Sequence, residues 1–332
     1  MRSRSLFSVI LFALAAGAAT ASPTAWTVTV GTEAVNGTWQ YNKFYPADLT
    51  IHPGDQVTFR FVTSDMHNVV FPVAGAHAVP GRIPDPADPK RMVPNPAIEK
   101  TADTVYDGKS PVSSGILKGT DDQPSNYTLT FTASGDLVYT CTVHAPVGPD
   151  GKVTGMVGWI HVVPQASPLP RTPAQSEALA RTQRAADTAS AEAADKDAHQ
   201  VSAKPDGSGH TLWTVSVGAT SSTGGEFMGF GSEDLHIQVG DTVEWVQKAI
   251  GAPHTVTFKK KGEMMMGPGA FGPSGGPTFD GTAGANSGMM PPLAMGREVK
   301  PFRLTFTKAG SFDYVCLPHE MMGMAATVTV GP

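Results

Sequence analysis

Two short motifs in this chain place a histidine three residues after a cysteine. The first reads Cys141-Thr-Val-His144 and the second reads Cys316-Leu-Pro-His319. Another histidine precedes each motif in a strand-like run, and a methionine follows each motif. One thiolate, two imidazoles and a thioether suit a trigonal copper site with a weak axial sulfur. The residue types therefore predict two such copper sites.

These ligands must be positioned by the segments around them, and those segments occur twice. Trp26-Thr-Val-Thr-Val-Gly31 corresponds to Trp213-Thr-Val-Ser-Val-Gly218, and Leu129-Thr-Phe-Thr corresponds to Leu304-Thr-Phe-Thr. The repeated blocks alternate apolar and polar residues and are rich in Val, Thr, Ile and Phe, as half-buried strands are. The same order of blocks in both halves indicates a domain duplication. It predicts an all-β fold with two tandem β-sandwiches.

Composition predicts where these domains begin and end. Residues 1–21 have the charged start, apolar centre and small-residue cleavage site of a secretory signal peptide. We expect the first domain at residues 22–163 and the second at residues 210–332. Residues 164–209 are polar and rich in Ala and Pro, so we expect them to form a linker. Its centre, residues 174–198, is rich enough in alanine to form a solvated helix.

The totals of the chain argue against several classes of protein. It has 36 glycines, 28 prolines and only 16% charged residues, which favours a turn-rich β architecture. The formal net charge of −5 argues against nucleic-acid binding. Two cysteines, each within a duplicated ligand pattern, fit neither a disulfide framework nor a zinc site well. With the signal peptide, the lack of a bilayer-spanning apolar segment predicts a soluble periplasmic or secreted protein.

The motifs and strand blocks resemble the cupredoxins, the superfamily of plastocyanin and azurin. The resemblance covers both halves and fails only in the linker and in two long insertions, residues 73–126 and 261–297. It implies two Greek-key β-sandwiches, each carrying one type 1 copper at one pole. The implied ligands are His67, Cys141, His144 and Met156 in the first domain, and His254, Cys316, His319 and Met324 in the second.

The two halves differ near these ligands. Residues 145–155 separate Met156 from its histidine, whereas Met324 follows its histidine by five positions. Both methionines nevertheless come just before the last strand-like segment of their half. The family often places Asn after the strand histidine, as Asn68 does here, but the second half has Thr255. Since hydrogen bonds around the ligands tune a metal, the two reduction potentials are predicted to differ.

Electron transfer is the function that the resemblance implies. Single electrons would enter and leave each copper through the histidine that follows the cysteine, His144 or His319. The implied partners are exported redox proteins, such as cytochromes or a terminal reductase or oxidase, which form small and transient contacts. Neighbouring residues that could form apolar contact patches are Ala145, Pro146 and Val147 in one half, and Leu317, Pro318 and Met321 in the other.

A copper enzyme is the main alternative, because tandem cupredoxin domains also occur in copper nitrite reductases and small multicopper oxidases. Those enzymes need histidines for a second kind of copper, including one directly before the cysteine. Thr140 and Val315 occupy these positions here, and the chain contains no His-x-His sequence. No phosphate loop or hydrolase motif is present either. We therefore expect a protein without enzymatic activity and without catalytic residues.

Copper storage or delivery is the third hypothesis, and it depends on a methionine-rich loop at residues 264–295. Thioethers are soft ligands that bind Cu(I), but methionines can also form a pliable docking surface. Two further methionines, Met321 and Met322, lie beside His319 in the sequence. The methionines of the loop are Met264, Met265, Met266, Met289, Met290 and Met295.

Replacing either cysteine should remove one copper chromophore and leave the other. In Cys141→Ser and in Cys316→Ser, we expect about half of the blue absorption of the purified, copper-loaded protein, because the thiolate is the ligand responsible for the strong band. Optical and electron-spin spectra, together with metal content, measure this loss. A colourless wild-type protein, or cysteines joined as a disulfide, would contradict the copper interpretation.

Overall fold

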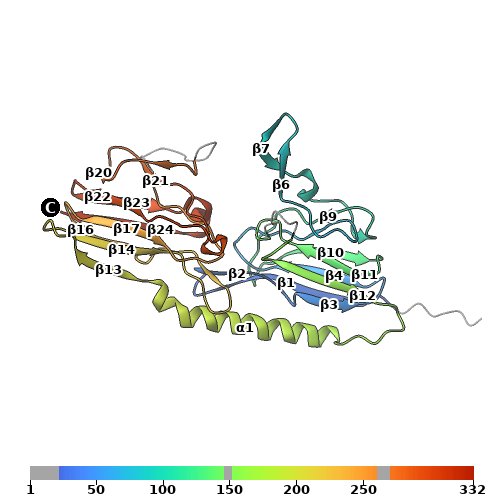
Figure 1. The fold of residues 1–332 in the computed structure, drawn as a ribbon. Helices are drawn as coiled ribbons and strands as arrows, with labels where there is room; N and C mark the ends of the chain where they lie inside the picture. The colour runs from blue at the N-terminus through green and yellow to red at the C-terminus, as the bar shows by residue number, and fades with distance from the viewer. Residues whose placement is uncertain (1–21, 146–151, 260–269) are drawn as a thin grey trace, which may run out of the picture.

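The repeated blocks form two β-domains that lie side by side along one long helix, α1 (Pro173–Ala198) (Figure 1). This computed structural model describes residues 22–145, 152–259 and 270–332. The expected signal peptide, residues 1–21, lies outside the described residues. Each domain consists of two sheets around a common core, which confirms the predicted all-β class with two tandem β-sandwiches.

Domain 1 packs two sheets against each other. Their strand orders are β15-β2-β1-β4-β10-β8 and β3-β12-β11-β5-β9, and β6 and β7 form a separate hairpin. The first insertion contributes this hairpin, a short 3-10 helix, η1 (Pro96–Ile98), and two short strands. The strands are β1 (Ala25–Ala34), β2 (Trp39–Tyr45), β3 (Asp48–Ile51), β4 (Gln56–Phe61), β5 (Val70–Phe71), β6 (Arg82–Asp85), β7 (Asp88–Pro94), β8 (Val105–Tyr106), β9 (Val112–Ser113), β10 (Ser125–Phe131), β11 (Gly135–Thr140) and β12 (Val157–Val162).

Domain 2 repeats this plan. Its sheets have the orders β13-β14-β17-β22-β20 and β16-β24-β23-β18-β21-β19. Two 3-10 helices, η2 (Leu293–Met295) and η3 (Leu317–Met322), lie before β22 and after β23. The strands are β13 (Val201–Pro205), β14 (Thr211–Val217), β15 (Glu226–Phe227), β16 (Asp234–Gln238), β17 (Thr242–Gln247), β18 (Thr257–Phe258), β19 (Pro273–Ser274), β20 (Thr278–Phe279), β21 (Ala285–Ser287), β22 (Phe302–Phe306), β23 (Gly310–Val315) and β24 (Ala325–Gly331).

A tryptophan and an aspartate fix the start of each sandwich in the same way. Trp26 Nε1 donates a hydrogen bond to Asp55 Oδ2, and Trp213 Nε1 donates to Asp241 Oδ2, each over 3.0 Å. Both aspartates also accept backbone N–H groups from their own turn. These bonds hold β1 parallel to β4, and β14 parallel to β17. The repeated tryptophan and the aspartate of the repeated Gly-Asp turn therefore stabilise the fold of each domain.

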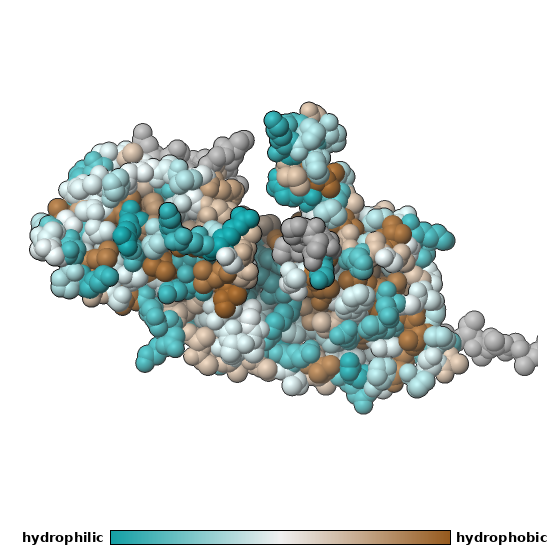
Figure 2. Space-filling view, viewed as in Figure 1, coloured by the Kyte–Doolittle hydropathy of each residue, from teal (hydrophilic) through white to brown (hydrophobic). Residues whose placement is uncertain are grey.

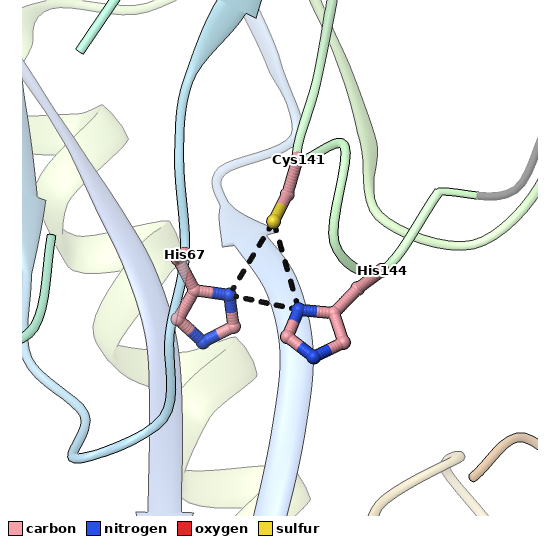
Figure 3. A group of neighbouring side chains, drawn as sticks. All are labelled: His67, Cys141 and His144. Carbon is pink, nitrogen blue, oxygen red and sulfur yellow. Dashed lines mark hydrogen bonds between the residues drawn. The ribbon is translucent and has the colours of Figure 1, made fainter. Parts of the chain in front are cut away.

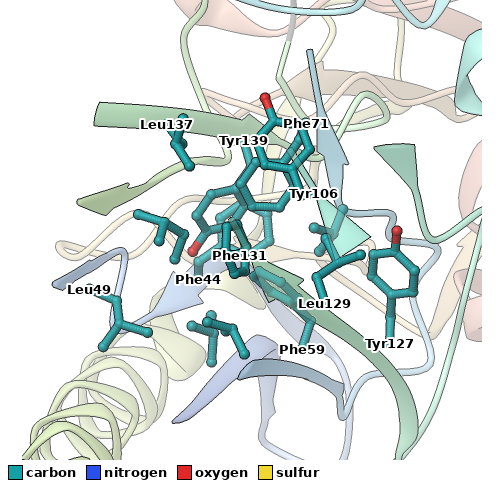
Figure 4. Close-up of a cluster of buried hydrophobic side chains, with 14 of the residues drawn as sticks. Phe44, Leu49, Phe59, Phe71, Tyr106, Tyr127, Leu129, Phe131, Leu137 and Tyr139 are labelled. Atoms are coloured by element: carbon teal, nitrogen blue, oxygen red, sulfur yellow. The ribbon is translucent and has the colours of Figure 1, made fainter. Parts of the chain in front are cut away.

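Buried aromatic rings fill the space between the two sheets of domain 1 (Figure 4). The ring centroid of Phe71 lies 5.0 Å from that of Tyr139 and 5.3 Å from that of Phe131. Cys141 and Met156 belong to the same buried cluster. Burying one large apolar side chain contributes about 1.5–3 kcal/mol. The core therefore holds in place the strand ends that carry candidate ligands.

Helix α1 packs against β1 and β2, in contrast to the solvated helix expected at residues 174–198. It begins with a capping box between Thr172 and Gln175. Ala191 and Ala198 are buried in a cluster with Trp39, because their small side chains allow close approach to the sheet. The rest of the expected linker is also ordered in part, since β13 pairs with β14. Within the described residues, no helix is long and apolar enough to cross a membrane.

Asp187 is the main polar anchor of α1. Its carboxylate accepts a hydrogen bond from the Tyr45 hydroxyl over 2.6 Å and pairs with Lys43 Nζ over 3.0 Å. Burial, followed by the bond to Asp187, raises the pKa of Tyr45 far above its usual value, so the hydroxyl remains a donor. One turn before the end of α1, Asp195 accepts a hydrogen bond from Trp39 Nε1 over 2.7 Å.

A short strand from the second half completes the first sheet of domain 1. In β15, Phe227 lies opposite Trp39 of β2, and their ring centroids are 5.4 Å apart. The next residue, Met228, donates its backbone N–H to Thr38 O over 2.7 Å. The space-filling view shows the two domains in contact over their lower part, with the β6–β7 hairpin above the junction (Figure 2). The domains are thus joined by a shared sheet as well as by α1.

Asp187→Asn should loosen α1 from domain 1. The substitution keeps the shape but removes the charge that Lys43 and Tyr45 face, and hydrogen bonds to charged groups contribute about 1.5–3 kcal/mol. Amide hydrogen exchange across α1 should therefore become faster. Asp197→Asn, an exposed position on the same helix, is the matched control and should leave exchange unchanged. Equal exchange in both variants would show that Asp187 does not anchor the helix.

Candidate metal centres

The three candidate nitrogen and sulfur ligands of domain 1 converge on one point (Figure 3). His67 lies in the loop before β5, Cys141 follows β11, and His144 lies in the turn after it. The Sγ of Cys141 is 3.7 Å from His67 Nδ1 and 3.6 Å from His144 Nδ1. The two Nδ1 atoms are 3.2 Å apart. His67 and Cys141 are buried, so the triangle is closed to bulk water on that side.

Domain 2 repeats this triangle with nearly the same dimensions. The Sγ of Cys316 is 3.6 Å from His254 Nδ1 and 3.4 Å from His319 Nδ1. The two Nδ1 atoms are again 3.2 Å apart. Within the described ranges, these two triangles are the groups of His, Cys, Asp and Glu side chains close enough together to hold a metal ion.

The chemistry of these donors fits copper. Each triangle combines one thiolate sulfur with two imidazole nitrogens, which is the ligand set of a trigonal type 1 site. Among the described residues, the buried Nε2 atoms of His67 and His254 have no hydrogen-bond partner. The Nδ1 atoms of the same rings face the cysteine sulfur, which makes them the nitrogens available to a metal ion. The two clusters, one per domain, account for the predicted pair of copper ions.

Both candidate axial methionines occupy the same place in the backbone network. Cys141 N donates to Met156 O over 3.0 Å, and Met156 N donates to His144 O over 3.0 Å. The corresponding bonds of Met324, to the cysteine and histidine of its own domain, measure 3.0 and 3.2 Å. Each methionine is 1% exposed. The longer interval in the first half is therefore accommodated between the histidine and Met156 without changing how the methionine enters the last strand.

The residue after each strand histidine secures the cysteine loop. Asn68 donates its backbone N–H to the cysteine Sγ over 3.5 Å, and its side chain both accepts from and donates to Thr142. Thr255 donates the equivalent N–H to its cysteine Sγ over 3.4 Å and accepts from Leu317 N over 2.8 Å. Asn68 thus makes two side-chain bonds to its loop where Thr255 makes one.

Two glycines form the wall behind the strand histidines. A Cβ at Gly31 would lie 3.0 Å from His67 Nε2, and one at Gly218 would lie 2.5 Å from His254 Nε2. Both glycines have positive φ, +73° and +63°, where side chains other than hydrogen are strained. These residues were not predicted as part of the sites, although each ends a Trp-Thr-Val-x-Val-Gly block that occurs in both halves.

Asp65 is a second residue that was not predicted, and it belongs to domain 1 alone. Its Oδ2 lies 3.2 Å from His144 Nε2, and its side chain is 10% exposed. Asp65 precedes the strand histidine by two positions, where the second half has Ala252. This difference between the repeats was the available signal. The carboxylate orients the His144 ring and increases the basicity of its other nitrogen, as partners of metal-binding histidines commonly do.

The two sites consequently differ in electrostatics. Burial alone would raise the pKa of Cys141, but hydrogen bonds and charges from His144 and His67 lower it to about 5. Burial opposes protonation of His144, yet its bonds to Asp65 and Cys141 raise its pKa to about 10. In domain 2, burial dominates. It raises the pKa of Cys316 to about 11 and is the main cause that lowers the pKa of His319 to about 4.

The residues expected to form apolar contact patches differ in exposure between the two domains. Met321 is 84% exposed, and Leu317 and Pro318 are half-buried beside it. Ala145 is buried, and Pro146 and Val147 lie outside the described residues. In the methionine-rich loop, Met289 and Met295 are exposed. Met290 is buried and its backbone pairs with His254, whereas residues 264–266 lie outside the described ranges.

Comparison with known proteins gives matches over both domains. A family model for copper-binding proteins of the plastocyanin/azurin family matches residues 32–156 and 216–331. Amicyanin from Paracoccus denitrificans is 32% identical over 95 residues, which cover 29% of this chain and 54% of that protein. Amicyanin from Paracoccus versutus is 31% identical over 97 residues, with 29% and 55% covered. The chain thus spans about half of the length of these curated relatives.

The solved structures that match this chain include variants of amicyanin. An oxidised amicyanin variant is 27% identical, with a TM-score of 0.23, and the match covers 36% of this chain and 80% of that chain. A reduced amicyanin variant is 24% identical, with a TM-score of 0.24, and the match covers 40% of this chain and 98% of that chain.

Gly218→Ala should weaken copper binding in domain 2 and spare domain 1. The new methyl group would meet the His254 ring, and disturbing residues around metal ligands typically costs about 10–100-fold in affinity. Competition with a copper chelator, followed by the blue absorption, measures the affinity of each site. Gly224→Ala is the control, because Gly224 also has positive φ but a Cβ there meets nothing within 4 Å. Equal losses in both variants would assign the effect to backbone strain.

Proposed function

Because the chain belongs to the plastocyanin/azurin family of copper-binding proteins, we propose that it is an electron carrier rather than an enzyme. Copper, when bound, supplies one-electron chemistry between Cu(I) and Cu(II). The observation that carries this proposal is the duplication of one buried cysteine and two histidines with nearly identical spacing in both domains. The proposed ligands are His67, Cys141, His144 and Met156 in domain 1, and His254, Cys316, His319 and Met324 in domain 2.

The surrounding residues suit electron transfer because they hold the ligands in one geometry. Each cysteine Sγ accepts a backbone N–H from the residue after the strand histidine. Each cysteine loop is also closed by backbone bonds to the proposed axial methionine. Ligands fixed in this way need little rearrangement when the charge of the bound ion changes. The buried cysteine further keeps water and other ligands away from the sulfur.

The face of domain 2 around His319 is the proposed contact surface for a redox partner. Met321 is 84% exposed, and Leu293 and Met295 of η2 are 40% and 54% exposed. η2 is joined to the neighbouring loop, since Leu293 N donates to Ala249 O over 3.1 Å. Ala249 packs with Met322 of the histidine loop, which brings these segments together. An apolar, weakly specific surface of this kind fits a transient partner such as an exported cytochrome or a terminal reductase or oxidase.

The position of the protein in the cell and the two alternative functions are part of the same proposal. The predicted signal peptide favours the periplasm or the exterior as the location. A nitrite reductase-like or oxidase-like enzyme is disfavoured, because Thr140 and Val315 occupy positions where such enzymes place a histidine. Copper storage or delivery is favoured only by the exposed methionines, and it predicts Cu(I) without a blue colour.

Copper content and spectroscopy test the proposed function directly. The mature protein should bind two copper ions, show strong blue absorption and take up two electrons reversibly, without turnover of oxygen or nitrite. Turnover together with a second electron-spin signal would support the enzyme. Colourless Cu(I) bound after both cysteines are replaced would support storage or delivery.

Met321→Glu should slow electron exchange with a c-type cytochrome by about tenfold, because an introduced carboxylate disrupts an apolar contact worth about 1.4 kcal/mol. Stopped-flow rates measured against cytochrome concentration give the second-order constant. Met92→Glu is the control, since Met92 is also an exposed methionine, 45% exposed, but lies on the β6–β7 hairpin of domain 1. The reduction potentials should remain the same in both variants. An unchanged rate in Met321→Glu would place the contact surface elsewhere.

A further inference from the structure

We propose that the two domains form an internal electron relay in which Asp65 makes domain 1 the donor and domain 2 the acceptor. The inference rests on the proposed electron-carrier function and adds a direction to it. It depends on two observations, which are the contact of Asp65 with His144 and the packing of Met228 between the β1–β2 turn of domain 1 and the ligand loops of domain 2. In the relay, one Cu(I) in domain 1 is oxidised to Cu(II) while one Cu(II) in domain 2 is reduced to Cu(I). No proton or further reactant is required.

The first observation is that, among the described residues, a carboxylate directly contacts a candidate histidine ligand in domain 1 and not in domain 2. Asp65 Oδ2 lies 3.2 Å from His144 Nε2, and both side chains are largely buried. A negative charge there makes the imidazole a stronger donor to the bound ion and stabilises the more positive Cu(II) state. Ala252 stands at the corresponding position of domain 2, and no carboxylate in the described part of the chain is paired with His319. Domain 1 therefore has the lower reduction potential.

Asp65 is held in this place by its own surroundings. Its Oδ1 accepts the backbone N–H of Met66 over 2.6 Å. The preceding residue, Ser64, is bonded through its hydroxyl to Glu33 of β1 over 2.6 Å. Burial alone would raise the pKa of Asp65, but the bond from His144 lowers it to about 2. The Asp65 carboxylate is thus held near the end of β1. The β1–β2 turn, which reaches the domain junction, follows directly.

The second observation is that the ligand loops of domain 2 pack at this junction, next to the β1–β2 turn of domain 1. Met228 bonds to Thr38, next to β2 of domain 1, and packs against Ala252 and Met322 of domain 2. Ala252 lies two residues before His254, and Met322 lies three residues after His319. One side chain, Met228, therefore bridges the β1–β2 turn of domain 1 and the ligand loops of domain 2.

Hydrogen bonds lead from Asp65 toward the same junction. Ser64, which precedes Asp65, is bonded to Glu33 near the end of β1. The β1–β2 turn that follows leads to Thr38, whose carbonyl accepts the N–H of Met228. Electrons that arrive at domain 1 can pass across the junction and leave through the exposed face around Met321.

Potentials of single-copper variants test the direction. The Cys316→Ser protein reports the site of domain 1, and the Cys141→Ser protein reports the site of domain 2. We expect domain 1 to favour the oxidised state at least about tenfold more than domain 2, which corresponds to about 59 mV for one electron. Asp65→Asn in the Cys316→Ser background should remove most of this difference. Asp136→Asn is the control, because Asp136 is an exposed carboxylate bonded to His161, which is not a proposed ligand.

Flash reduction of the fully oxidised two-copper protein by a photoexcited reductant tests the relay itself. The electron should move from domain 1 to domain 2 at a rate that does not depend on protein concentration. A rate proportional to concentration, or a higher potential in domain 1, would overturn the relay while both sites remained blue and reversible. If neither single-copper variant were blue and reversible, the proposed electron-carrier function would itself be wrong.

Discussion

Each site depends on a buried cysteine sulfur that is held beside two imidazoles by the ends of strands. The cysteine lies between the core of its sandwich and the histidine loop, so its position is fixed by packing on one side and by backbone hydrogen bonds on the other. The glycine behind the strand histidine, Gly31 or Gly218, leaves room for the ring where a Cβ would contact it. Packing and backbone hydrogen bonds therefore bring the donors together at one point.

The two domains share the arrangement of the donor atoms but differ in the charges around them. The triangles of donor atoms agree within a few tenths of an ångström, and both methionines enter the last strand through the same backbone bonds. The differences lie around the ligands, where Asn68 is matched by Thr255 and Asp65 by Ala252. A charge placed on the outer nitrogen of one histidine alters the preferred oxidation state without altering the ligands. Two similar centres can thus perform different parts of one task.

The sequence predicted the features that depend on local pattern. Strand alternation, the repeated blocks and the spacing of Cys141 to His144 were sufficient for the fold class, the family and the two copper ions, and all three are confirmed. The individual metal ligands, including Met156, remain predictions. The packing of α1 was not foreseen, because Ala191 and Asp187 look like residues of a solvated helix until Trp39 and Tyr45 are brought to them from far away in the chain. Asp65 was missed for the same reason, since its contact with His144 joins two distant loops.

The strand β15 has a consequence for any attempt to study the halves one at a time. It is encoded after the linker, yet it occupies the edge of a sheet whose other strands all come from the first half. A fragment that stops before it would leave β2 with unpaired backbone groups and Trp39 without its neighbour Phe227. Exposed strand edges of this kind promote self-association and aggregation. The first half thus relies on a strand of the second half to complete its own sheet, so a cut between the halves removes part of a domain that lies before the cut.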